Sequence, residues 1–198
     1  MSAPRQNLVL TDLIDRLPYP LAPVAGQWLR GVSTFEEYPV DRRELPYVVC
    51  RVAGIVLRIA GAIAIRALVQ AHSTDASLNA LVVSTLRSPT DGMWHQLVQR
   101  ASKAVREAQP WAQILFDTLS SRQVSIEPSI RVTLDGSPRR VDHALQRLVE
   151  FRRDLVHGQN PDGETVRLAC AHLEVVLRGF GWLADCSIRA RWRGSEWS

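Results

Sequence analysis

The stretch from Leu148 to Gly158 reads Leu-Val-Glu-Phe-Arg-Arg-Asp-Leu-Val-His-Gly and combines an apolar stripe with an arginine, a histidine and a helix stop. Its apolar residues recur with the 3.6-residue period of an α-helix, and they are Leu145, Leu148, Val149, Leu155 and Val156. Arg152 lies on the same face, so its side chain is expected to point inward or into an interface. A guanidinium keeps its proton, and its burial therefore requires a carboxylate, a phosphate or water in close contact.

Gly158 predicts the end of this helix, because glycine adopts the left-handed conformation without steric cost. A turn is indicated directly afterwards, over Asn160-Pro161-Asp162-Gly163. His157 falls in the last helical turn, where exposed carbonyls favour a cationic imidazole and allow titration near neutral pH. Arg152 and His157 are roughly 140° apart on an ideal helix. A helix that ends at the histidine can let the two side chains converge.

Outward from this stretch, the sequence predicts a succession of helices. The motif helix over Asp142–His157 and a last helix over about Thr165–Ile188 form an antiparallel hairpin, and Tyr47–His72 is a central core helix that does not cross a membrane. Residues 1–45 are expected to form a wrapping segment of short pieces, because prolines there and at Pro46 break long helices. Further helical pieces are expected at Leu8–Leu17, at Leu78–Leu86, from Met93 onward and at Trp111–Leu119. A short hairpin or ordered loop is expected over 124–134 and a frayed tail over 189–198.

Length and composition predict one domain over residues 1–198, because 46% hydrophobic content can bury a single good core. The three cysteines, Cys50, Cys170 and Cys186, have neither CxxC pairing nor a histidine spacing suited to zinc, so no metal site is expected. The N-terminus lacks the order of a signal peptide, and a reduced cytoplasm fits best. The sequence contains no glycine-rich phosphate loop, HExxH pair or GxSxG elbow, and no cofactor is expected.

The net charge of +4 permits nucleic-acid binding, but Lys103 is the only lysine, so arginine richness in itself is discounted as a compositional bias. Clustering is more informative, since six arginines and three acids lie between Arg131 and Arg153. The candidate RNA contacts from this cluster are Arg139, Arg140, Arg147 and Arg153. The alternative is a solvated helix face with a basic loop.

Phe151-Arg152-Arg153-Asp154-Leu155-Val156-His157-Gly158 resembles the signature of HEPN domains, an arginine followed after four to six residues by histidine and often glycine. The resemblance extends to the Leu17–Leu21 segment with its nearby tryptophan, the long apolar helix, the stretch Ser88–Trp94 and the leucine-rich last helix. It implies an all-α bundle that dimerises by pairing its motif helices. HEPN-like modules occur in multidomain bacterial signalling and conflict proteins.

Catalytic members of this family are metal-independent endoribonucleases. Carried over to this chain, the resemblance implies that His157 is the general acid or base and that Arg152 holds the scissile phosphate, with a 2′,3′-cyclic phosphate as product. Active members usually carry Asn, Asp or His directly after the arginine, where this chain has Arg153. Asp154 can substitute from the next position and is the third candidate catalytic residue.

Three hypotheses stay open on the sequence. The chain is a dimeric ribonuclease of defence or toxin type, with RNA as substrate and an antitoxin or effector protein as partner. Alternatively, it is a non-catalytic interaction or oligomerisation module, which the Arg153 departure favours. In the third hypothesis both residues are structural: Arg152 forms an internal salt bridge with an acid on a neighbouring helix, and His157 only caps backbone carbonyls at the helix end.

Overall fold

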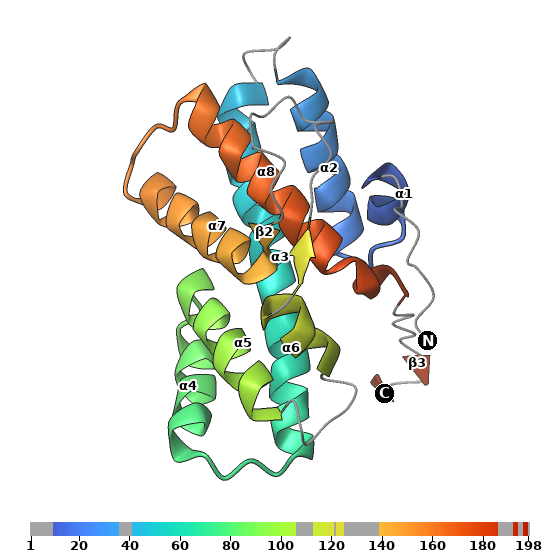
Figure 1. Ribbon diagram of the computed structural model, residues 1–198, viewed down its shortest axis with the longest axis vertical. Coiled ribbons are helices and arrows are strands. Elements are labelled where there is room, and N and C mark those ends of the chain that lie inside the picture. The colour runs from blue at the N-terminus through green and yellow to red at the C-terminus, as the bar shows by residue number, and fades with distance from the viewer. Residues whose placement is uncertain are drawn as a thin grey trace.

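A computed structural model describes residues 10–35, 41–105, 113–120, 122–124 and 139–185, together with the backbone of 192–193 and 196–197. The fold is an all-α bundle, as expected, with eight α-helices in the described residues (Figure 1). The helices are α1 (Leu10–Asp15), α2 (Leu21–Thr34), α3 (Asp41–Gln70), α4 (Ala76–Arg87), α5 (Asp91–Val105), α6 (Gln113–Ser120), α7 (Val141–Val156) and α8 (Gly163–Gly179), followed by a 3-10 turn at Gly181–Asp185.

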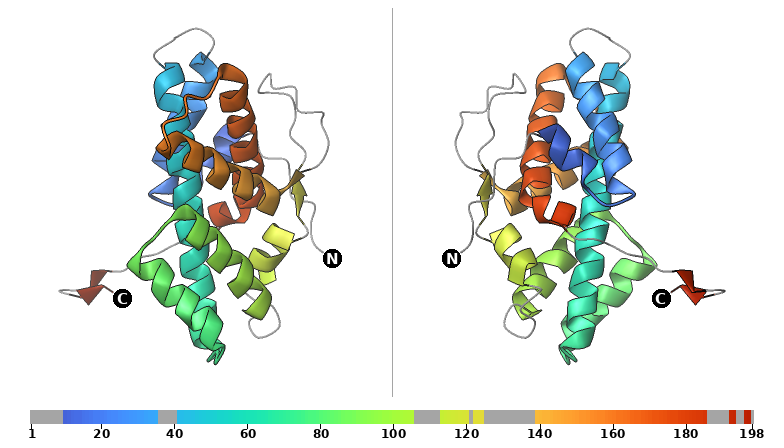
Figure 2. Two further views of the ribbon diagram at one scale, coloured as in Figure 1. Left: turned by 90° about the vertical axis from the view of Figure 1, so that its left-hand side faces the viewer. Right: turned by 90° about the vertical axis from the view of Figure 1, so that its right-hand side faces the viewer.

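Helix α3 runs along the long axis of the molecule and forms its centre (Figures 1 and 2). Helices α2, α5, α7 and α8 all pack on it. Its buried face is built of small and β-branched residues, among them Val49, Val52, Val56, Ala64 and Ala67. Short side chains let several helices approach one axis closely, which is why so many neighbours share this helix. The prediction of a central core helix is confirmed.

By length and composition, the part of α3 from Glu44 to Gln70 is apolar enough to cross a membrane. However, 61% of its most apolar window is buried by the rest of the chain. The core helix of a soluble protein passes the same test of length and hydropathy, so the result does not by itself assign α3 to a membrane.

Pro46 lies inside α3. We had expected Pro46 and the prolines of the first 45 residues to prevent long helices. Helix α3 begins at Asp41, six residues before the predicted start at Tyr47. A proline in the second turn removes one hydrogen bond near the helix end and leaves the later turns intact. The expectation of short pieces holds for α1, but it was wrong for α2, whose 14 residues include Pro23, and at Pro46. Pro23 lies in the first turn of α2, where its missing N–H removes no helical hydrogen bond.

The motif helix matches its prediction closely, since α7 spans Val141–Val156 and His157 is its C-terminal cap residue. Gly158 has a φ of 81°, the left-handed value that the stop requires. The Gln159 N–H donates to the Asp154 carbonyl and the Gly158 N–H to the Leu155 carbonyl, both at 3.0 Å. These two bonds form a Schellman cap that fixes the direction in which the chain leaves α7.

The last helix is shorter than predicted, because α8 ends at Gly179 instead of Ile188. Gly179 lies against the start of α7, where an added Cβ would be 2.3 Å from Val141 Cγ2. The following Phe180 is buried with a φ of −86° and a ψ of 12°, outside helical geometry. The antiparallel α7–α8 hairpin is confirmed, and in the described residues up to Asp185 the chain beyond Phe180 forms the 3-10 turn.

Two short antiparallel strand pairs complete the described chain. Strand β1 (Gln123–Val124) pairs with β2 (Arg139–Arg140), and β3 (Trp192–Arg193) pairs with β4 (Glu196–Trp197). Most of the predicted hairpin over 124–134 lies outside the described residues, and β1 pairs with a strand beyond that range. Within the tail predicted to fray, β3 and β4 are the described parts.

We expect Gly61→Ala to lower the free energy of unfolding by about 2 kcal/mol, because the added methyl overpacks the α3–α5 contact. An added Cβ would lie 2.3 Å from Cε3 of Trp94, whose ring is buried. The substitution also gains about 1 kcal/mol of helix propensity, which is smaller than the cost of the clash. Urea unfolding followed by circular dichroism measures the difference.

Gly26→Ala is the matched control for this prediction. An added Cβ at Gly26 meets only Arg30 Nη1, at 3.6 Å, so this variant is expected to be as stable as the wild type or more stable. A Gly61→Ala variant that gains stability like the Gly26 control would contradict the packing described here.

Candidate functional site

Arg152 leaves α7 toward the start of α5 and forms an ion pair with Asp91 through its Nη1 atom. The Asp91 side chain is 6% exposed, whereas that of Arg152 is 40% exposed. Arg58 of α3 lies on the other side of the carboxylate, with its Nη2 atom 3.7 Å from Asp91 Oδ1. Three helices thus bring two arginines and one aspartate together, and we call this group the Asp91–Arg152 cluster.

Gly54 of α3 provides the floor of the cluster. An added Cβ there would lie 3.0 Å from Arg58 Nη1 and 3.4 Å from both Arg152 Nη1 and Asp91 Oδ2. A side chain at this position would compete for the space that the guanidinium groups occupy. The glycine therefore lets charged groups lie close to the backbone of the central helix.

Sequence reasoning required a partner for Arg152 but did not identify it. Asp91 is the first residue of α5, where an acid is also favoured by the helix dipole. Arg58 and Gly54 were missed as site residues. The one signal in the sequence was that a partly buried Arg152 needs an acidic partner. This signal did not identify which acid of the chain is the partner.

The Asp91–Arg152 cluster carries a net positive charge, since two guanidinium groups share one buried carboxylate. Arg58 is 46% exposed, so both arginines reach the surface while the aspartate lies beneath them. The Oδ1 atom of Asp91 is buried and has no hydrogen-bond partner among the described residues. A half-exposed pair of guanidinium groups is a suitable site for an anion such as a phosphate.

Cys50 of α3 is buried close enough to the cluster to feel its charges. Burial raises the pKa of the Cys50 thiol to about 12; the charge of Arg152 opposes this rise and that of Asp91 adds to it. At neutral pH the group is therefore a thiol and not a nucleophilic thiolate.

His157 is exposed at the end of α7. Its backbone N–H donates to the Arg153 carbonyl at 3.0 Å, and no side-chain hydrogen bond or ion pair of His157 is found in the described part of the chain. Among the described residues, no hydrogen bond or ion pair joins His157 to Arg152. The expected convergence of the two side chains is thus not brought about by a direct contact within one chain.

The third candidate catalytic residue, Asp154, is half-buried and pairs with Arg153, whose Nε lies 3.4 Å from Asp154 Oδ1. The adjacent Val156 is 74% exposed, although the periodicity placed it on the apolar face. The end of α7 thus presents an apolar side chain, a charged pair and a histidine together at the surface.

The predicted RNA-binding arginines are spread over α7 and the strand before it. Arg139 and Arg140 form β2, and Arg147 is exposed and paired with Glu150 at 3.0 Å. Arg153 is exposed and paired with Asp154, as described above. The arginine excess is therefore partly neutralised by neighbouring acids.

Asp142 connects the start of α7 to α5. The Gln99 side-chain amide donates to Asp142 Oδ1 at 2.7 Å, and His95 Nε2 lies 3.0 Å from the same oxygen. The hydrogen bond from His95 lowers the pKa of the Asp142 carboxyl, burial opposes this, and the bond from Gln99 lowers the pKa further. These bonds fix α7 against α5 at the end opposite to His157.

His172 of α8 is buried beside His143 of α7, and their rings are in edge-to-face contact with centroids 6.2 Å apart. Burial lowers the pKa of His172 to about 4, and the charges of Arg139, His143 and Arg147 lower it further. The folded chain therefore holds this imidazole neutral at pH values where an unfolded chain protonates it.

We expect the protein to lose stability as the pH falls from about 6.5 to about 4, by roughly 3 kcal/mol from His172 alone. The sign follows from the lowered pKa, because the unfolded state binds a proton in this range and the folded state does not. Urea unfolding at a series of pH values measures the slope. His172→Leu should reduce the dependence of the free energy of unfolding on pH. If the variant and the wild type lose the same stability as the pH falls, the acid sensitivity belongs to other groups.

Comparison with protein-family models, with curated proteins and with solved structures finds no match to this chain. Within the part of the chain that the structure describes, no group of three or more His, Cys, Asp or Glu residues could hold a metal ion.

Proposed function

We propose that the protein is a HEPN-type, metal-independent endoribonuclease of the cytoplasm that acts in bacterial defence or as a toxin. The observation that carries the proposal is the placement of Arg152 and His157. Arg152 is half-exposed and fixed by a buried carboxylate, and His157 is exposed at the end of the same helix. A fixed cation and a solvent-accessible imidazole are the two groups that RNA transesterification needs.

In the proposed reaction, His157 acts as the general base that removes the proton of the ribose 2′-hydroxyl. The 2′-oxygen attacks phosphorus and the bond from phosphorus to the 5′-oxygen breaks. The leaving 5′-oxygen takes up a proton from a histidine imidazolium, which is His157 after it has accepted the 2′-hydroxyl proton or His157 of a second copy. Arg152 holds the phosphate and stabilises its added charge, and Arg58 supplies a second guanidinium beside it. The products are a 2′,3′-cyclic phosphate and a 5′-hydroxyl.

A homodimer completes the proposed site. Arg152 and His157 have no direct contact in one chain, so His157 of a second copy is a source of the general base or acid. The 74% exposed Val156 lies beside the motif, where a paired α7 helix of the second copy would cover it. The active dimer would then contain two arginines and two histidines in one groove.

The test is incubation of the purified chain with structured and single-stranded RNA in EDTA, with analysis of the product ends. We expect cleavage that leaves cyclic phosphates and is unaffected by removal of metals. Cleavage that EDTA abolishes, or products with 5′-phosphates, would contradict the mechanism.

The second candidate is a non-catalytic interaction or oligomerisation module of a defence or signalling system. It is favoured by Arg153, which stands where active members usually carry Asn, Asp or His. The ion pair of Arg152 with Asp91 is the internal salt bridge that the third hypothesis predicted, and it accounts for the partly buried arginine without a ligand. A folded, dimeric protein that leaves every RNA intact would select this candidate over the nuclease.

A further inference from the structure

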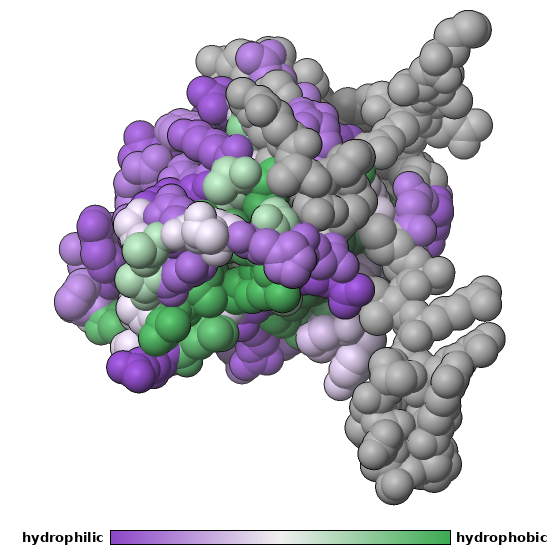
Figure 3. Space-filling view, turned by 90° about the horizontal axis from the view of Figure 1, so that it is seen from below, coloured by the Kyte–Doolittle hydropathy of each residue, from purple (hydrophilic) through white to green (hydrophobic). Residues whose placement is uncertain are grey.

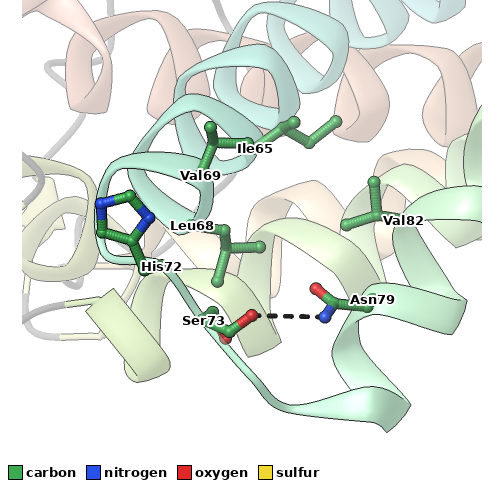
Figure 4. Close-up of a pocket in the computed structure, with 7 residues that line it drawn as sticks. All are labelled: Ile65, Leu68, Val69, His72, Ser73, Asn79 and Val82. Carbon is green, nitrogen blue, oxygen red and sulfur yellow. Dashed lines mark hydrogen bonds between the residues drawn. The ribbon is translucent and has the colours of Figure 1, made fainter.

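An apolar groove lies between the C-terminal part of α3 and α4, away from the residues of the Asp91–Arg152 cluster. It is lined by Ile65, Leu68 and Val69 of α3, by His72 and Ser73 of the turn that follows, and by Asn79 and Val82 of α4. Val83 and Leu86 continue the α4 stripe at helical spacing. Figure 4 shows side chains of both helices around the space between them, with the Asn79 amide donating to the Ser73 carbonyl at 3.3 Å. We call this surface the α3–α4 groove.

The groove is exposed to an extent that is unusual for such side chains. Val69 is 67% exposed, Leu86 57% and Val83 48%, and Figure 3 shows apolar side chains gathered on this face of the molecule. Helix α4 packs on α5, and it turns its buried residues, Leu78 and Thr85, inward. On its other side Val82 is partly buried against the core, whereas Val83 and Leu86 are exposed. Exposed apolar side chains gathered on one surface indicate an interaction site.

The size of the groove fits a side chain better than a small molecule. It holds about 210 Å³, whereas pockets for drug-sized ligands hold about 300–1,000 Å³. A shallow groove between two helices, bordered by i, i+3, i+4, i+7 stripes, is the geometry that receives the apolar face of a third helix.

The charges around the groove indicate which charge a bound partner helix should carry. Arg66 lies three residues before Val69, and Arg87 lies four residues after Val83, so both are neighbours of the exposed valines on their helices. Between Arg51 and Ser88 the only acid is Asp75, whose carboxylate is occupied in capping α4 by bonds from the Ser77 and Leu78 N–H groups. A basic rim around an apolar groove is complementary to an acidic amphipathic helix.

We propose that the α3–α4 groove binds an amphipathic helix of a partner protein, with apolar anchors at i, i+3 or i+4, and i+7 and with Asp or Glu beside them. The site shares no residue with the Asp91–Arg152 cluster or with His157. The proposal is therefore independent of the nuclease function and adds a docking surface of defined chemistry to either candidate function.

The experiment selects helical peptides of about 20 residues on the full chain, from a displayed library with free choice of acidic, basic or neutral residues beside fixed leucine anchors. We expect acidic sequences to be enriched. Anisotropy titration of the best peptide should give binding that weakens as salt is raised, at least tenfold weaker for Val69→Ser and Leu86→Ser, and several-fold weaker for Arg66→Gln and Arg87→Gln.

Leu168→Ser on α8 and Arg51→Gln near the start of α3 are the matched controls, since both residues are exposed outside the groove. They should leave peptide binding unchanged, and circular dichroism establishes that every variant is folded. The proposal is overturned if no peptide is enriched, if basic peptides are enriched, or if the groove variants bind as the wild type does.

Two further results would assign the groove to another occupant and also overturn the proposal. The first is binding to phosphatidylserine vesicles, lost in Val69→Ser and Leu86→Ser, in the absence of peptide binding. The second is self-association of the chain that these same two variants abolish, measured by analytical ultracentrifugation.

Discussion

Alanine in place of Arg152 lowers the free energy of unfolding by about 3 kcal/mol at neutral pH, because it leaves the buried carboxylate of Asp91 without its ion-pair partner. Breaking a buried pair from one side typically costs about 3–5 kcal/mol. The lower end applies here, since Arg152 is 40% exposed and Arg58 remains 3.7 Å from the carboxylate. Urea unfolding of the variant and the wild type measures the loss.

The double variant Asp91→Ala/Arg152→Ala separates this effect from a loss of packing. With the carboxylate also removed, no charge is left buried and unpaired, so the double variant should recover more than half of the stability lost in Arg152→Ala. Additive losses from the two single substitutions would show that the pair is not coupled.

The structural role of Arg152 affects how the proposed nuclease function is tested. Loss of cleavage in Arg152→Ala does not distinguish a phosphate contact from a destabilised site, because the same residue holds α7 against α5. Arg152→Lys keeps a positive charge near Asp91 and removes the planar fork that binds phosphate through two bonds. Its cleavage rate therefore needs to be compared at temperatures where both proteins are folded.

His157→Ala is expected to lower the RNA cleavage rate by a factor of about 10²–10⁴, the usual contribution of a general acid or base. The side chain is exposed and makes no bond in the described structure, so the free energy of unfolding should change by less than about 1 kcal/mol. Single-turnover cleavage assays with an RNA that the wild type cleaves measure the rate.

His143→Ala is the matched control, since His143 is also exposed and lies near the start of the same helix. It should cleave RNA within a few-fold of the wild-type rate. Equal activity of His157→Ala and the wild type would remove His157 from the mechanism and favour the interaction module.

The motif helix was predictable because its signals are local. A 3.6-residue apolar period sets the helix, and only a residue that tolerates a positive φ can stand at Gly158. The end of α8 was not predictable from local signals, since the apolar period continues past Gly179 while the backbone leaves helical geometry at the buried Phe180. The close approach of Gly179 to Val141, 38 positions earlier in the chain, is likewise a contact between distant parts of the sequence.

The candidate site divides in the same way. Periodicity placed Arg152 on the inner face of its helix and demanded an acid, but the acid lies on α5, and packing of α5 and α7 on α3 brings the two together. A contact between helices far apart in the sequence depends on how they cross, and no local pattern specifies that angle. Gly54 and Arg58 were missed for the same reason.

Helix α3 also determines how the molecule can open. Because α2, α5, α7 and α8 all rest on it, the backbone hydrogen bonds in its middle are shielded until these helices separate together. Amide hydrogens around Val56 should therefore exchange with deuterium only when the whole bundle unfolds, while those of α4 exchange through smaller openings. The slowest-exchanging amides of this chain are thus expected at its centre, where they report its global stability directly.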